Sequence, residues 1–155
     1  MDVSRNAVEL LRQDHREVEN LISQIEGLSR FESGVHSPDA AFLKLKENLM
    51  LHALAEEQIF YPVLKAGEAT AALVPQAYRK HQQIKDLLER MSELSPKTEE
   101  FRLLLAELKT ELTHHISEEE NEMFVKAVQT LSAENLIELG QKIQQMKTRE
   151  KLNRA

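Results

Sequence analysis

Apolar residues recur along this chain with alternating spacings of three and four, in five separate segments. That alternation is typical of the buried stripe of a helix in a left-handed bundle. The stripe positions are, segment by segment, Leu11, His15, Val18, Ile22 and Ile25; Phe42, Leu45, Leu49, His52, Glu56, Ile59 and Val63; Val74, Ala77, His81, Ile84, Leu88 and Met91; Leu105, Leu108, Leu112, His115, Glu119 and Met123; and Leu136, Leu139, Ile143 and Met146. The pattern predicts an all-α fold built on four helices, followed by a fifth.

Serine, proline and glycine residues indicate where these helices begin and end. We expect the first helix to end near residues 27–30 and residues 31–38 to form a polar loop. Pro62 is expected to kink the last turn of the second helix, which Gly67 closes. The expected starts of the other helices are Ser37-Pro38 for the second, Pro75 for the third, Ser95-Pro96 for the fourth and Ser132 for the fifth, which leads into a basic, frayed tail.

The polar residues within the stripes belong to a pattern that occurs twice. The segment HALAEEQIF from His52 recurs as HISEEENEM from His115, and the frame around His15 recurs around His81. Residues four apart lie on one face of a helix, so each repeat directs an imidazole and a carboxylate toward the same point. The six residues form a ligand set suited to a pair of metal ions: His15, His52, Glu56, His81, His115 and Glu119.

The alternative interpretation is a set of ordinary core histidines. A single histidine on an apolar face is usually a core residue with satisfied hydrogen bonds, but four on four stripes disfavour that explanation. Two ionised glutamates buried without a cation would also cost several kcal/mol each. The neighbouring acidic residues and the two remaining histidines fall outside the stripes, so we interpret them as solvated residues: Glu57, Glu118, Glu120, His36 and His114.

Composition limits the possible functions. A chain of 155 residues favours one domain, with the four-helix bundle in residues 1–130 and a C-terminal helix and basic tail in 131–155. The net charge of −6 argues against nucleic acid as a partner, and the absence of cysteine excludes disulfides and thiolate metal ligands. There is no apolar run of membrane-spanning or signal-peptide type, so we expect a cytoplasmic protein.

The motifs resemble the hemerythrin-like, or HHE cation-binding, family from residue 7 to about 130. The segments that carry the resemblance are DHREVENLI, HALAEEQIFYP, KHQQIKDLL and HHISEEENEMF. The resemblance implies an up-down-up-down antiparallel four-helix bundle, here with an additional C-terminal helix. It also implies two oxo- or hydroxo-bridged iron ions, with Glu56 and Glu119 as bridges and His15, His52, His81 and His115 as terminal ligands. Mn or Zn would also suit such a donor set.

One departure from the family pattern bears on function. Oxygen-carrying hemerythrins use five histidines, two of them in a His-x3-His pair on the third helix. Here Ala77 and Lys85 occupy the positions four before and four after His81, so we do not expect a reversible oxygen carrier. The remaining set is similar to that of bacterial di-iron proteins that repair iron–sulfur clusters. Tyr78 and Glu122 are candidates for an additional oxygen ligand.

The resemblance therefore predicts a di-iron protein that binds or senses O2, NO or peroxide, or acts in iron, oxidative or nitrosative stress. No catalytic or organic-cofactor residues are indicated, and redox reaction at the irons is the one enzymatic activity compatible with the sequence. The alternative function is a metal-free or zinc-bound helical scaffold. Such a scaffold would act through a protein partner or a second copy bound to the C-terminal helix.

Overall fold

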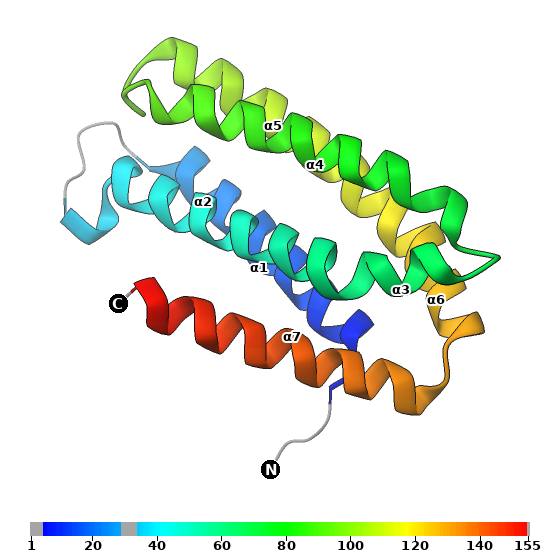
Figure 1. Ribbon diagram of the computed structural model, residues 1–155. Helices are drawn as coiled ribbons and strands as arrows, with labels where there is room; N and C mark the ends of the chain where they lie inside the picture. The colour runs from blue at the N-terminus through cyan, green and yellow to red at the C-terminus, as the bar shows by residue number, and fades with distance from the viewer. Residues whose placement is uncertain (1–4, 29–33, 155) are drawn as a thin grey trace.

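All regular structure in residues 5–28 and 34–154, which the computed structural model describes, is helical (Figure 1). This confirms the all-α prediction. The elements in chain order are α1 (Ala7–Gly27), η1 (Gly34–His36), α2 (Pro38–Ala55), η2 (Glu56–Phe60), α3 (Tyr61–Ala66), η3 (Ala71–Leu73), α4 (Val74–Ser92), α5 (Glu99–Glu118), η4 (Glu119–Met123), α6 (Phe124–Thr130) and α7 (Ala133–Arg154).

Four helical rods form an antiparallel bundle, as predicted. α1 packs against α2 and α4 packs against α5, while α2 continues through η2 into α3 and α5 continues through η4 into α6. The fifth helix, α7, lies along α1 and α2, on the side of the bundle away from α4 and α5 (Figure 1). None of the helices in the described residues is long and apolar enough to cross a membrane.

Most helix boundaries follow the predicted caps. Ser37 accepts a hydrogen bond from the Ala40 N–H at the start of α2, and Ser132 accepts one from the Asn135 N–H at the start of α7. α1 ends at Gly27 and α3 ends before Gly67, as expected. Part of the predicted 31–38 loop lies outside the described residues.

Two boundary predictions were wrong. The fourth rod begins at Glu99 with Thr98 as its N-cap, because the Ser95 hydroxyl instead accepts from the Lys97 N–H in a preceding turn. The basic tail is also not frayed, since α7 remains helical through Arg154.

The two rods that carry the His-x3-Glu repeats each contain a π-helical turn, which the sequence pattern did not predict. The turns span Glu56–Phe60 and Glu119–Met123, so each begins at the glutamate of its repeat. A π turn holds one extra residue and moves everything after it to a new phase. Phe60 and Leu64 consequently take the buried positions that the 3-4 alternation assigned to Ile59 and Val63, which are partly exposed.

Pro62 does not account for the irregular turn. The second π segment has the same length and position in its repeat, yet Val125 stands where the first repeat has Pro62. The common features of the two sites are the buried glutamate and the histidine four residues before it.

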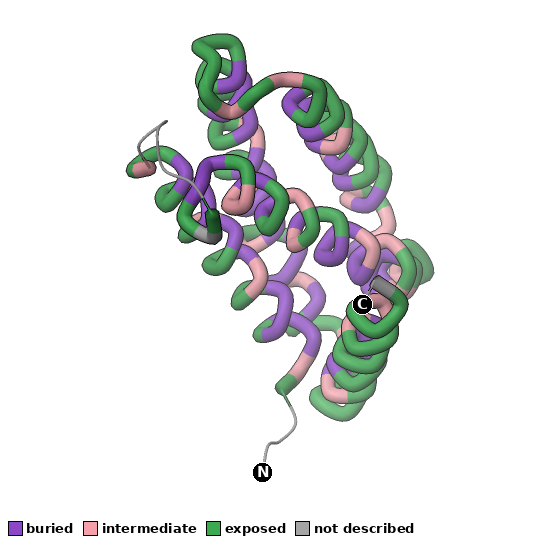
Figure 2. Tube along the Cα trace, turned by 90° about the vertical axis from the view of Figure 1, so that its left-hand side faces the viewer, coloured by how far each residue is buried: buried purple, intermediate pink, exposed green. Residues whose placement is uncertain are grey.

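Buried side chains line the inward faces of all the rods (Figure 2). They form two apolar clusters. One, at the end covered by α7, includes Leu11, Phe60 and Ile143, and the other, toward the α4–α5 turn, includes Leu45 and Leu108. α7 approaches the start of α1 so closely that a Cβ on Gly140 would lie 2.4 Å from the Arg5 carbonyl oxygen. The fifth helix thus shares a core with the bundle.

Candidate metal centre

The six polar residues of the stripes meet inside the bundle, between the two apolar clusters. They come from all four rods, and none is more than 6% exposed. Their nitrogen and oxygen atoms form two groups, each with its potential ligand atoms within 4.8 Å of one another. The groups are His15, His52, Glu56 and Glu119, and Glu56, His81, His115 and Glu119.

Both glutamates belong to both groups, and each lies between imidazoles of the two groups. Glu56 Oε1 is 3.2 Å from His52 Nε2 and 3.0 Å from His81 Nε2. Glu119 Oε1 is 3.0 Å from His15 Nε2, and its Oε2 is 3.5 Å from His115 Nε2. Two carboxylates shared in this way can bridge two cations, each also bound by two imidazoles.

Some buried polar atoms of this cluster make no hydrogen bond. His52 Nε2 and His115 Nε2 lie near a carboxylate oxygen but are not aligned for a hydrogen bond, and Glu56 Oε2 is buried in the described structure without a hydrogen-bond partner. Buried polar atoms without partners are costly and rare in folded proteins. A metal ion in each group would satisfy them, so the residues present fit the cations that the family resemblance implies.

Three of the imidazoles make a hydrogen bond from Nδ1, the ring nitrogen that faces away from the cluster, to a carboxylate. The Nδ1 contacts are His15 with Glu120 at 2.7 Å, His52 with Asp14 at 2.8 Å and His81 with Glu57 at 2.7 Å. Such a contact keeps the proton on Nδ1 and leaves Nε2 free to bind a metal. The sequence analysis assigned Glu57 and Glu120 to a solvated face, and this was wrong, because their side chains are only 20% and 19% exposed.

Each of these outer carboxylates has its own cation. Arg16 binds Glu120, Lys85 binds Glu57 at 3.1 Å, and Lys147 of α7 binds Asp14. Each outer carboxylate thus lies between a buried imidazole and a lysine or arginine on the outside. His115 differs from the other three imidazoles, since its Nδ1 has no hydrogen-bond partner among the described residues.

Tyr61 is a member of the site that the sequence analysis missed. Its hydroxyl lies 3.0 Å from Glu56 Oε1, within hydrogen-bond distance of Glu119 Oε2, and 3.2 Å from His81 Nε2, so its one proton can be donated to either carboxylate. The π turn brings Tyr61 inward, since its N–H bonds to the Glu56 carbonyl five residues back. The Tyr-Pro pair after the first repeat was visible in the sequence, but only the extra residue of the π turn places it there.

The two oxygen ligands suggested by the sequence lie outside the cluster. The Tyr78 side chain is 38% exposed, and its hydroxyl donates to the Glu57 carbonyl at 3.1 Å. The Glu122 side chain is 55% exposed and lies 3.9 Å from Lys126 Nζ. His114, interpreted as a solvated residue, is indeed exposed and faces Glu118.

When no metal is bound, protonated imidazoles supply positive charge to the cluster. Burial alone would lower the pKa of His52, but the Glu56 charge and the hydrogen bond to Asp14 raise it to about 10. Burial likewise opposes the hydrogen bonds to Glu56 and Glu57 that raise the pKa of His81 to about 9. These imidazoles are therefore positively charged near neutral pH when no metal is bound.

The pKa values of three other groups of the site are also shifted. Burial would raise the pKa of Glu56, but the charge of His52 and hydrogen bonds from both imidazoles hold it well below its usual range. Burial lowers the pKa of His115 despite the nearby Glu119 carboxylate. Burial, with the charges of Glu119 and Glu56, raises the pKa of Tyr61 well above 10, so its hydroxyl stays protonated and donates.

This chain is similar to known proteins both in structure and in sequence. In structure, the chain is similar to a hemerythrin HHE cation-binding domain-containing protein from Mycobacterium kansasii, with a TM-score of 0.81 and 25% identity over 94% of this chain and 86% of that one. In sequence, it is 26% identical over 131 residues to a DNA nickase from Nostoc sp.. That alignment covers 83% of this chain but only 35% of the nickase, so the chain spans about a third of that protein.

The family model for the hemerythrin HHE cation-binding domain matches residues 6–127, which contain all six residues of the buried His/Glu cluster. That match covers most of the chain and all four rods of the bundle. The chain therefore belongs to the hemerythrin HHE cation-binding domain family.

Proposed function

We propose that this protein holds two iron ions, one in each His/Glu group, and uses them to bind or sense O2, NO or peroxide. The observation that carries the proposal is the pair of overlapping groups, each with two imidazoles and the same two glutamates. Mixed imidazole and carboxylate donors suit iron, with Mn or Zn as alternatives. Bound iron would supply redox chemistry toward small oxygen and nitrogen species.

The charges of the cluster are compatible with two bound cations. Glu56 and Glu119 are the anions of the inner cluster, while Asp14, Glu57 and Glu120 are each paired with an outer cation. Two buried carboxylates need compensation, which protonated imidazoles supply in the metal-free protein. Metal binding would displace these protons and supply the same compensation.

The protein's own residues would orient and protect the metals. The three outer carboxylates fix the ring orientation of His15, His52 and His81. Apolar clusters pack on either side of the site. The Tyr61 hydroxyl would hold its proton between Glu56 and Glu119 and act there as a hydrogen-bond donor.

The scaffold alternative receives less support. The apolar stripe of α7 (Leu136, Leu139, Ile143 and Met146) is already buried against the bundle. The outer face of the helix, which includes Gln141, Gln145 and Arg149, is largely polar. A partner or second copy bound to this face would therefore meet mainly polar side chains, together with the exposed Leu152.

The test is metal analysis of the purified protein together with its optical spectrum before and after exposure to O2 and NO. We expect about two irons per chain, from the two ligand groups, and ligand-dependent changes in absorption. Protein that takes up no iron under anaerobic reconstitution, or that binds iron without any spectral response to either gas, would contradict the proposal.

A further inference from the structure

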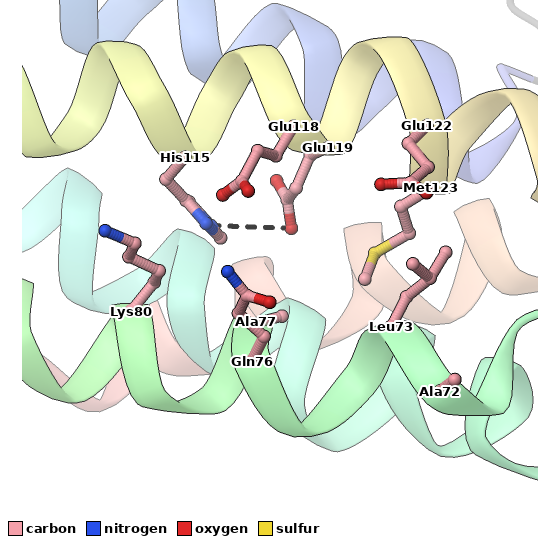
Figure 3. A pocket seen from close by; sticks show the side chains of 10 residues that line it. All are labelled: Ala72, Leu73, Gln76, Ala77, Lys80, His115, Glu118, Glu119, Glu122 and Met123. Atoms are coloured by element: carbon pink, nitrogen blue, oxygen red, sulfur yellow. Dashed lines mark ion pairs between the residues drawn. The ribbon is translucent and has the colours of Figure 1, made fainter.

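A cavity outside the metal centre lies between α1, α2 and the C-terminal half of α7. Its volume is about 190 Å³, and none of the six residues of the buried His/Glu cluster lines it. A smaller cavity, of about 70 Å³, is a separate space (Figure 3). It borders the half of the cluster that contains His81 and His115, so it belongs to the metal centre. The larger cavity is therefore a candidate site for a different ligand.

The buried residues that line the larger cavity are all apolar. They are Leu10 and Val18 of α1 and Leu51 of α2, and none is more than 9% exposed. These side chains form a floor between the helices. A ligand with a hydrocarbon part would bind well here, because covering the floor removes apolar surface from water.

Charged side chains surround that floor. Lys147 and Lys151 come from α7, and Arg5 lies just before the start of α1. Asp14 and Glu17 of α1 are the acidic residues of the lining, so basic residues outnumber acidic ones by one. This balance matches a ligand with a single negative charge and disfavours one with two.

The two lysines have donors available for such a ligand. Lys147 binds Asp14, which holds His52 in the other half of the cluster, and an ammonium group has three N–H donors. Lys151, one turn further along the helix, forms no ion pair with the residues that the structure describes. Like charges four residues apart on a helix repel each other, so an anion placed between the two lysines would be stabilising.

The end of α7 also attracts anions to this place. The chain as a whole has a net charge of −6, but residues 141–154 contain five basic side chains and one acidic side chain. This stretch is the last part of α7, which lies beside α1 and α2 (Figure 1). A local excess of positive charge raises the concentration of small anions near it.

We propose that the larger cavity binds a small organic monocarboxylate. The carboxylate lies between Lys147 and Lys151, and the short alkyl part rests on Leu10 and Leu51. The amide of Asn48, which also lines the cavity, can bond to a carboxylate oxygen or to a hydroxyl group beside it. A volume of about 190 Å³ is below the roughly 300–1,000 Å³ of sites for drug-sized ligands, so the ligand is a small molecule.

The test uses isobutyrate, which has one carboxylate and a branched alkyl group. Its binding to the full-length protein is measured by ligand-observed NMR at millimolar concentrations. We expect Lys151→Ala to weaken isobutyrate binding by about tenfold, because it removes a charged hydrogen-bond donor. Lys142→Ala is the matched control, since it removes the same charge from an exposed position of α7 that does not line the cavity, and it should bind as the parent does.

Two comparisons separate this site from the metal centre and from unspecific binding. Isobutyramide, the uncharged analogue, should bind at least about tenfold more weakly than isobutyrate. Binding of isobutyrate should also persist after the metal is removed by chelation. Equal binding to the Lys151 and Lys142 variants, equal binding of the acid and the amide, or binding that disappears with the metal would each overturn the proposal. None of these outcomes bears on whether the His/Glu cluster holds iron, which metal analysis tests separately.

Discussion

Replacing Tyr61 by Phe should destabilise the metal-free protein while leaving its fold unchanged. The substitution removes only the hydroxyl, which bonds to Glu56 and Glu119 and lies 3.2 Å from His81 Nε2. Phenylalanine should fit, because Phe124 occupies the corresponding place in the other repeat and is fully buried. The effect should therefore come from the lost hydrogen bonds rather than from a cavity.

The magnitude follows from the burial of the groups involved. The Tyr61 ring is fully buried, and Glu56 and Glu119 are 0% and 2% exposed, so water cannot replace the lost donor. Removing one hydrogen-bond donor from buried carboxylates costs roughly 1–3 kcal/mol. For a chain of this size each kcal/mol lowers the melting temperature by about 2–4 °C. We therefore expect a decrease between about 2 and 12 °C in the metal-free protein.

Tyr78→Phe is the matched control. Its hydroxyl is at a partly exposed position and donates to the Glu57 carbonyl, so its removal should change stability by less than about 0.5 kcal/mol. Both variants are compared with the parent in urea unfolding and thermal melting after chelation of metal. Equal stability of the Tyr61 and Tyr78 variants, with unchanged m-values, would show that the Tyr61 hydroxyl does not hold the two glutamates as described.

Three further predictions concern the metals, the fifth helix and pH. Glu119→Ala should lose most of the bound iron because the residue belongs to both ligand groups, whereas His114→Ala should keep it; equal iron contents by metal analysis would refute the assignment. Lys147→Ala leaves Asp14 without its cation and should lower iron affinity about 10- to 100-fold in chelator competition, with no change if α7 is only packing. The pKa of His52 is raised from 6.5 to about 10, so its stabilising contribution is complete below pH 6.5 and is lost as pH rises toward 10. The melting temperature of the metal-free protein should therefore fall over that range, and a flat profile would contradict the charged imidazole.

The sequence predicted that these six His and Glu residues would be buried together, because the stripe is a strong constraint. A buried stripe admits few polar residues, so His15, His52, His81 and His115 stood out against it. All six residues lie on regular α-helix or at its end. His15 and His81 lie on α1 and α4, and the two His-x3-Glu pairs come before the π turns have changed the helical phase. Their role as metal ligands stays a prediction that iron analysis can test.

The sequence pattern failed beyond Glu56 and in the layer around the imidazoles, whereas Met123, beyond Glu119, is buried as the stripe predicted. Periodicity assumes 3.6 residues per turn, and one π turn in each rod breaks that assumption, so Tyr61 was missed and Ile59 was misplaced. Glu57 and Glu120 were assigned to solvent because each follows a ligand by one position. Their contacts are with histidines on neighbouring rods, and no pattern within one helix can reveal such pairs.

The π turns also explain how a repeated motif gives two chemically different halves. In each rod the residue five after the glutamate returns its N–H to that glutamate's carbonyl, so its ring is placed beside the cluster. In one rod that residue is Tyr61, and its hydroxyl enters the half that the smaller cavity borders. In the other rod it is Phe124, which stacks on His15 in the half that α7 covers. The Tyr61 hydroxyl, which contacts both buried glutamates, and the imidazole that has no outer carboxylate, His115, thus lie in the same half of the cluster as the smaller cavity.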